Sequence, residues 1–181
     1  MKLNPSKCVF RVSSGMFLGF MVLQRRVEAN LENIQAILEM TPPKNIKEIQ
    51  SLNGRVTALS RFISKATKKC LPFFKTLKKS SEWIDECQKS FKELKVYLMS
   101  PLLLSLSKLG EELSLYLAVS PTTISSALIW GEDRIQLLVY YTSQALQGLE
   151  GRYLPMEKLA FALVTTTWKL RSYFQAHTIV V

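Results

Sequence analysis

The stretch SLYLAVSPTTISSALIW, residues 114–130, decides the fold class of the second half of the chain. Apolar residues alternate with small or polar ones as far as Val119, the run SPTT at 120–123 interrupts them, and the alternation resumes from Ile124 to Trp130. A period of two on both sides of a turn sequence predicts a β-hairpin. The hairpin contains no Asp or Glu, so it offers no acid for catalysis or metal binding.

The segments that follow extend the hairpin into a unit of strands and one helix. Residues 135–142 and 177–181 have the composition of strands, and Pro155 opens a segment with helical spacing of apolar residues up to about Phe174. The second half therefore has the predicted order β-β-β-α-β. We expect its boundary with the first half between residues 101 and 111.

The first half is predicted to be mainly helical. Residues 2–30 fit a strand pair that turns near residues 24–26, and helices are expected from Asn30, from Asn45 and over 84–98. Asn45 precedes Glu48 by three residues, the spacing of a capping box. A shorter helix is expected with Pro72 in its first turn. The fold class is thus α+β.

The charge of the chain points to a polyanionic partner. Its 181 residues contain 24 Lys and Arg against 14 Asp and Glu, a net charge of +10. Nucleic acid is the leading partner class and an anionic membrane surface the second. No apolar run approaches the roughly 20 residues of a membrane span, and the N-terminus has no signal-peptide core. We therefore expect an intracellular protein of the cytoplasm or nucleus that has no membrane partner.

Cysteine, histidine and glycine usage argues against a cofactor. Cys8, Cys70 and Cys87 are odd in number and widely spaced, and His177 is the single histidine. This pattern predicts reduced structural thiols and a structural histidine, with no zinc site. The seven glycines are scattered and form no phosphate-binding loop.

Cations are densest between Arg55 and Lys95. Eleven cations stand against four acids there, a net of +7: Arg55, Arg61, Lys65, Lys68, Lys69, Lys75, Lys78, Lys79, Lys89, Lys92 and Lys95. Helices with this charge density can neutralise phosphates without reading base sequence. The alternative is a solvated face that only keeps the helices soluble.

Taken together, several motifs resemble the pol polyprotein of plant retrotransposons of the Ty3/gypsy type, over essentially the whole chain. The motifs are LNPSKCVF at 3–10, FLGFMV at 17–22, VEANLENIQAIL at 27–38, SLNGRVTALSRFISK at 51–65, CLPFF at 70–74, WIDECQKSFKELKVYLMSP at 83–101, YLAVS at 116–120, RYLPMEKLAFALV at 152–164 and KLRSYFQAHTIVV at 169–181.

The resemblance implies three parts. Residues 1–28 resemble the end of a reverse transcriptase palm, in which Phe17, Leu18, Gly19 and Phe20 match the primer-grip hairpin. Residues 29–101 resemble the thumb and connection helices, and residues 102–181 resemble a truncated RNase H-like domain. The polymerase carboxylates of the family, with their Tyr-x-Asp-Asp turn, would lie before Leu3, so this chain is not expected to polymerise.

The resemblance also implies how a nuclease site would be built. RNase H chemistry needs two divalent ions about 4 Å apart, Mg²⁺ in the intact family, held by converging carboxylates. Active members carry Asp within Thr-Asp-Ala-Ser, and the matching residues here place Ala118 at the Asp position. Glu157 matches the helix glutamate of the family, although by itself it would only favour the helix dipole. A third ligand would follow residues 177–181. We therefore predict that the metal site is lost and that the chain does not hydrolyse RNA.

The sequence thus predicts a non-catalytic part of a reverse transcriptase that binds and positions an RNA/DNA hybrid or duplex DNA, together with the remainder of the polyprotein. The alternatives are a working RNase H and a degenerate relic without function. The residues expected to contact nucleic acid are Phe17, Leu18, Gly19, Phe20, Arg55, Arg61, Lys65, Lys68, Lys69, Lys75, Lys78 and Lys79.

Overall fold

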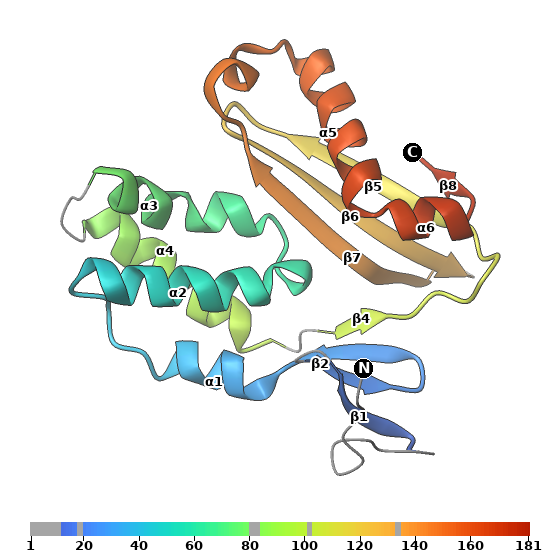
Figure 1. Cartoon of the computed structure of the whole chain (residues 1–181), viewed down its shortest axis with the longest axis horizontal. Helices are drawn as coiled ribbons and strands as arrows, with labels where there is room; N and C mark the ends of the chain where they lie inside the picture. Colours follow the sequence, from blue (N-terminus) through green and yellow to red (C-terminus); the bar gives the residue numbers. More distant parts are fainter. Residues whose placement is uncertain (1–11, 18–19, 80–83, 101–102, 133–134) are drawn as a thin grey trace, which may run out of the picture.

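The computed structural model describes residues 12–17, 20–79, 84–100, 103–132 and 135–181. Two regions lie side by side (Figure 1). One consists of a small sheet and four helices, and we call it the helical region. The other is a second sheet with two helices over it. The predicted α+β class is confirmed.

The first sheet is antiparallel and contains four strands in the order β1-β2-β3-β4. Its strands are β1 (Ser14–Phe17), β2 (Phe20–Leu23), β3 (Arg26–Ala29) and β4 (Leu103–Ser105). The chain turns between β2 and β3, where the sequence predicted a turn. Strand β4 was not predicted, because three residues are too few to show a period. Leu104 pairs with Val27, so the segment that follows the last helix of the region returns to this sheet.

The two asparagine caps of the helical region are confirmed. The Asn30 side chain accepts from the Glu32 N–H at 2.8 Å and begins α1 (Leu31–Leu38). The Asn45 side chain accepts from the Glu48 N–H at 2.9 Å and begins α2 (Ile46–Ala58). A short 3-10 helix, η2 (Ser60–Phe62), follows α2. Each cap satisfies a backbone donor that the first helical turn leaves free.

Helices α3 (Ala66–Lys79) and α4 (Asp85–Leu98) complete the region. The expectation that Pro72 lies in a first turn is wrong, because α3 begins six residues earlier and Pro72 lies inside it. A proline in this position loses one backbone hydrogen bond. Burial of its neighbour Phe73, which is 0% exposed, offsets that loss.

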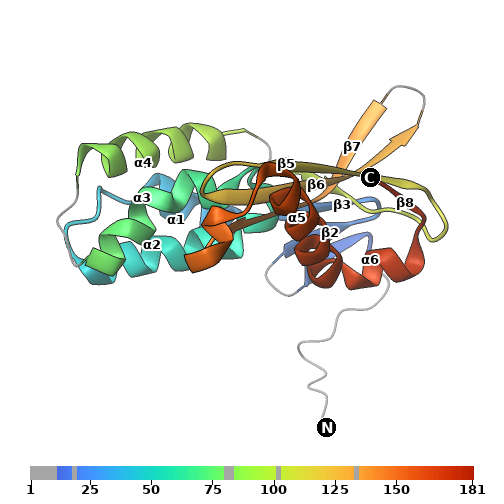
Figure 2. The same cartoon turned by 90° about the horizontal axis from the view of Figure 1, so that it is seen from above.

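The second sheet has the strand order β7-β6-β5-β8. Strands β5 (Leu113–Val119), β6 (Thr123–Glu132) and β7 (Ile135–Ala145) are antiparallel, and β8 (Ile179–Val180) runs parallel to β5. The predicted β-β-β-α-β order is confirmed. The single helix predicted after Pro155 is instead two helices, α5 (Pro155–Lys169) and α6 (Arg171–Ala176), preceded by a 3-10 helix, η3 (Gly148–Arg152). Helix α5 crosses one face of the sheet (Figures 1 and 2).

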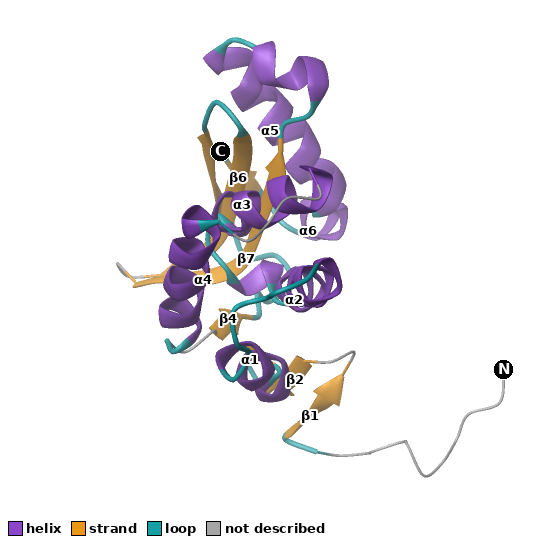
Figure 3. Ribbon diagram, turned by 90° about the vertical axis from the view of Figure 1, so that its left-hand side faces the viewer, coloured by secondary structure: helices purple, strands orange, loops and turns teal. Residues whose placement is uncertain are grey.

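The helical region packs against the second sheet at β7. The elements that contact β7 are α3, η2 and β4. Figure 3 shows this arrangement from the helical side. The Ser143 hydroxyl on β7 accepts from the Thr67 N–H at 3.0 Å and lies 2.9 Å from the Thr67 hydroxyl. Among the described residues, no helix combines the length and apolar character needed to cross a membrane.

Candidate nucleic-acid interface

Helix α3 is the most basic element of the chain. It carries five lysines and no carboxylate. Lys68 and Lys75 are seven residues apart, which places them on the same side of the helix, and both are exposed. Lys65 is also exposed and directly precedes α3 with a φ of +51°. None of these three side chains has an ion pair or hydrogen bond to a described residue, so their charges face solvent. The side chains of Lys78 and Lys79 lie outside the described residues.

Lys69 and Arg55 are less accessible than their neighbours. The Lys69 ammonium lies 3.5 Å from the centre of the Tyr97 ring. Burial lowers the pKa of Lys69, so this cation is partly withdrawn from water. Arg55, in the last turn of α2, is half-buried, and its Nε has no hydrogen-bond partner among the described residues.

Arg61 lies between two aromatic rings at the junction of the two regions. Its guanidinium carbon is 4.8 Å from the centre of the Phe20 ring on β2 and 4.7 Å from that of Tyr140 on β7. Such stacking fixes the plane of the guanidinium. The pKa of Tyr173 is raised by burial, and the charge of Arg61 partly offsets that rise. Arg61 is therefore a positioned cation and not a mobile surface charge.

The primer-grip residues predicted from the resemblance are only partly described. Phe17 and Phe20 are paired across the β1–β2 hairpin. The Phe17 side chain, Leu18 and Gly19 lie outside the described residues. The Phe20 ring packs inward, 5.8 Å from the Phe62 ring, and also against Arg61. This ring therefore holds β2 against η2.

Lys95 shows why a count of cations overstates the accessible charge. Its ammonium donates to the carbonyl oxygens of Leu38 at 2.8 Å and Met40 at 2.7 Å. These carbonyls belong to the end of α1, where a cation also favours the helix dipole. Lys89 and Lys92, on the same helix as Lys95, are exposed.

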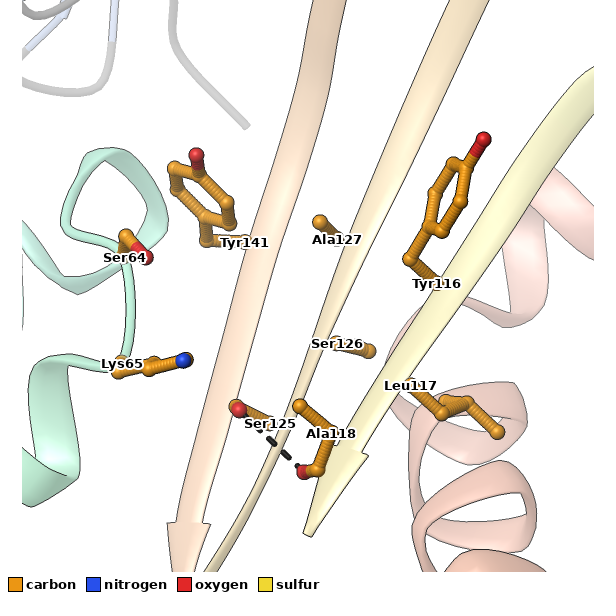
Figure 4. Close-up of a pocket in the computed structure, with 9 residues that line it drawn as sticks. All are labelled: Ser64, Lys65, Tyr116, Leu117, Ala118, Ser125, Ser126, Ala127 and Tyr141. Atoms are coloured by element: carbon orange, nitrogen blue, oxygen red, sulfur yellow. Dashed lines mark hydrogen bonds between the residues drawn. The ribbon is translucent and has the colours of Figure 1, made fainter.

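The acid-free hairpin faces the helical region. Tyr116, Ala118, Ser125, Ala127 and Tyr141 line a cavity of about 100 Å³ that Ser64 and Lys65 border from the other side. Lys65 extends toward the strands in Figure 4. Leu113, Leu115 and Leu117 contribute to the core beneath α5 and α6. Ala118 follows the alternation onto the other face of β5, so its side chain points away from the helix that carries Glu157.

Glu157 is a capping residue. It is exposed, and its carboxylate accepts from the Leu154 N–H at 2.8 Å, at the start of α5. Among the described residues, no three His, Cys, Asp or Glu side chains are grouped closely enough to hold a metal ion. A site for two Mg²⁺ ions needs several converging carboxylates. The described residues near Ala118 and Glu157 do not fit it.

The remaining sequence predictions concern His177 and the cysteines. The Nδ1 atom of His177 lies 2.9 Å from the Glu111 carbonyl oxygen, and its Nε2 atom lies 3.2 Å from the Ser107 hydroxyl oxygen. Its structural role is confirmed. Cys70 and Cys87 are buried free thiols, as predicted. Cys8 lies outside the described residues.

Sequence reasoning missed Tyr97, Tyr140 and Lys169 as parts of the basic surface. Tyr97 and Tyr140 contact cations of a different element, and no pattern local to either tyrosine reveals that contact. Lys169 lies far along the chain from the densest cations, yet Ser143 on β7 is its neighbour. Only the packing of α5 on the second sheet brings it near η2.

Comparison with known proteins is decisive for the family. Residues 83–181, just over half of the chain, match the model of the RNase H-like domain found in reverse transcriptase. The chain belongs to this family. The curated relatives include the Tf2-3 and Tf2-4 transposon polyproteins of Schizosaccharomyces pombe, each 24% identical over 178 residues. Those matches cover 96% of this chain and 13% of each polyprotein.

Solved structures share the fold of this member of the family. The foamy viral protease-reverse transcriptase in complex with RNA/DNA hybrid is 22% identical with a TM-score of 0.73, covering 87% of this chain and 22% of that one. The same viral protein in complex with dsDNA is 20% identical with a TM-score of 0.75, covering 93% and 36%. At this identity the likeness concerns the fold.

Proposed function

We propose that this chain binds and positions a nucleic-acid duplex, an RNA/DNA hybrid or duplex DNA, through its phosphate backbone and does not cut it. The observation that carries the proposal is α3, a helix with five lysines and no acid. Its exposed cations have no partner among the described residues. The viral proteins of similar fold were solved with RNA/DNA hybrid and with dsDNA, which supports the same class of partner here.

The exposed lysines Lys65, Lys68 and Lys75 form what we call the α3 surface. The length of this surface suits a phosphate backbone. Ten residues separate Lys65 from Lys75, and at 1.5 Å per residue they span about 15 Å. One strand of a duplex presents a charge about every 3.4 Å along its axis, so roughly four phosphates lie within this length. We expect each of the three exposed lysines to neutralise one phosphate. A plot of the logarithm of the binding constant against the logarithm of the salt concentration should then have a slope of roughly −2.7.

Two features support the non-catalytic part of the proposal. Ala118 cannot ligate a metal, and the Glu157 carboxylate is engaged at the helix terminus. A duplex bound on the α3 surface would therefore be held without hydrolysis. We further propose that the remainder of a polyprotein is its partner, within the cytoplasm or nucleus, and that the source element is of the plant Ty3/gypsy type.

Fluorescence anisotropy with a labelled hybrid at 50 and 200 mM salt tests the binding. The contribution of these three lysines, a slope of roughly −2.7, by itself predicts an affinity about 40-fold lower at the higher salt, and each further phosphate contact steepens the slope. The variant Lys68→Gln/Lys75→Gln should lose about two thirds of that slope. The matched control Lys47→Gln/Lys108→Gln removes two exposed cations outside α3 and should keep most of it. An affinity that is the same at 50 and 200 mM salt, or an absence of binding, would refute the proposal.

Incubation with Mg²⁺ or Mn²⁺ and the labelled hybrid separates this function from a working RNase H. We expect no cleavage above a Glu157→Ala control, and none when Ala118→Asp restores a single carboxylate. Cleavage that Glu157→Ala abolishes would establish the enzyme instead. A cooperative melt of the purified monomer would count against the degenerate relic.

A further inference from the structure

A polar cavity lies between η2, β7 and the end of α5. It has a volume of about 250 Å³ and is lined by Ser60, by residues 140–143 and by Lys169. A second cavity of about 240 Å³ shares Ser60, Ser143 and Lys169 with it and reaches Cys70 and Phe74 on α3. The two cavities are therefore adjacent. None of their lining residues is an Asp or Glu.

Lys169 lines this space without a counter-ion, and a second cation, Arg61, contacts one of the lining residues. The Lys169 ammonium is 3.5 Å from the Ser143 carbonyl oxygen, a long contact, and burial lowers its pKa. Arg61 stacks on the ring of Tyr140, which lines the cavity. Neither Lys169 nor Arg61 has an ion pair with a described residue. A cation without a counter-ion gains free energy when an anion approaches.

We propose that this cavity binds one phosphodiester group of a nucleic-acid strand. A phosphodiester only accepts hydrogen bonds, and the cavity offers two donors, the ammonium of Lys169 and the hydroxyl of Ser60. Arg61, stacked on Tyr140, adds positive charge beside the cavity. The Ser60 hydroxyl makes no hydrogen bond to a described residue. The volume exceeds that of a phosphate and leaves room for the attached sugar.

The cavity also leads toward the α3 surface. A third cavity of about 650 Å³ shares Thr67 and Phe74 with the second one and is also lined by Leu71 and Lys75. A strand held at Lys169 could therefore continue past Phe74 to Lys75. In this respect the inference rests on the proposed function and adds one defined contact to a surface of exposed lysines.

Lys169→Gln tests the contact, with Lys169→Arg as the conservative variant and Lys108→Gln as the control for loss of one charge. Thermal melts establish that the variants are folded. For the hybrid at 100 mM salt, Lys169→Gln should lower affinity on the order of fivefold and make the salt slope shallower by roughly 0.9. Lys169→Arg and Lys108→Gln should stay within about twofold of the wild type. Equal effects of Lys169→Gln and Lys108→Gln would overturn the proposal.

A direct titration is independent of duplex binding. Thymidine dinucleotide, which has one phosphodiester, should shift the backbone amide resonances of Ser60, Thr142 and Ser143 in the wild type and not in Lys169→Gln. If inorganic phosphate shifts them and the dinucleotide does not, the site takes a free anion and the proposal is wrong. If a hexaglutamate peptide causes larger shifts than the dinucleotide, the cavity binds acidic peptides and the proposal is wrong. If hybrid binding itself is absent, the proposed function fails and this titration still decides the cavity.

Discussion

The helical region and the second sheet bury different kinds of side chain. Seventeen of the described residues form the apolar core of the helical region, and five form that of the second sheet. The second sheet instead buries linked hydroxyls: Thr166 on α5 donates to Ser126 on β6 at 3.1 Å, and Ser126 is 2.7 Å from Thr142 on β7. Apolar burial therefore dominates the stability of the helical region, whereas directed hydrogen bonds contribute more in the second sheet.

The charges divide in the same way. The helical region presents cations on α3 and stacks others on aromatic rings, while the residues of β5 and β6 that line the cavity beside Lys65 include no acid. A large apolar core allows one helix to concentrate like charges, because its buried face offsets their mutual repulsion. Under the proposed function, the helical region supplies most of the contacts to the duplex, and the second sheet adds the cavity at Lys169.

The largest effect is expected from truncation of the helical core. Phe73→Ala should lower the free energy of unfolding by about 3–5 kcal/mol, because Phe73 is fully buried. Its neighbour Phe74, 36% exposed, is the matched control and should lose much less as Phe74→Ala. Urea unfolding measures both. Equal losses would mean that the core does not dominate the stability of this region.

The next effect is a loss of stability at alkaline pH. Burial raises the pKa of Cys70 from 9.0 to about 12. Because the folded-state pKa is raised, the stabilisation is complete below pH 9 and is lost as pH rises from 9 toward 12. At 1.36 kcal/mol per pKa unit the loss reaches about 4 kcal/mol. Cys70→Ala should flatten this part of the curve of unfolding free energy against pH. An unchanged curve in the variant would contradict the assignment.

The hydroxyl chain of the second sheet should have a smaller effect. Thr166→Val keeps the shape of the side chain but removes the donor to Ser126, and should cost about 1–2 kcal/mol of unfolding free energy. Thr167→Val is the control, because the Thr167 hydroxyl bonds only to Leu163 within its own helix. Chemical denaturation of the two variants compares them. If both lose the same amount, the buried chain has no special role in the second sheet.

The smallest effect concerns the residue before α3. Lys65 has a φ of +51°, a conformation that glycine adopts without strain. Lys65→Gly should therefore raise the unfolding free energy by about 0.5–1 kcal/mol. Lys68→Gly, inside the helix, should lower it by about 1 kcal/mol. Both variants lose one exposed cation and should weaken hybrid binding alike. Thermal melts measure the stability of the two variants, and anisotropy measures their affinity for the hybrid. If only Lys68→Gly loses affinity, the loss reflects its lower stability and not the missing charge.

Much of the secondary structure could be predicted from local patterns. The caps at Asn30 and Asn45 and the hairpin of residues 114–130 were predicted because each depends on residues close together in the chain. Strand β4 and the helical placement of Pro72 were not, because pairing with β3 and burial of Phe73 outweigh the local preference. The break between α5 and α6 at Leu170 likewise has no strong local signal.

The candidate interface shows the same limit more sharply. Sequence counting treated Lys65, Lys69 and Lys95 as equivalent cations. In the structure one is exposed, one lies over Tyr97, and one caps the end of α1. The partners of Lys69 and Lys95 lie 28 and more than 50 residues away along the chain. Charge density is a property of composition, but the accessibility of each charge is a property of packing.

The sequence by itself determined the α+β class, the order of most elements, the excess of cations between Arg55 and Lys95 and the absence of acids from the hairpin. These features depend on residue type and short spacing. Only the tertiary structure decided which cations face solvent, that Ala118 points away from the helix of Glu157, and that Lys169 and Ser60 line one cavity. The cavity joins Ser60 to Lys169, more than a hundred positions later in the chain, and it exists only after the two regions have packed together.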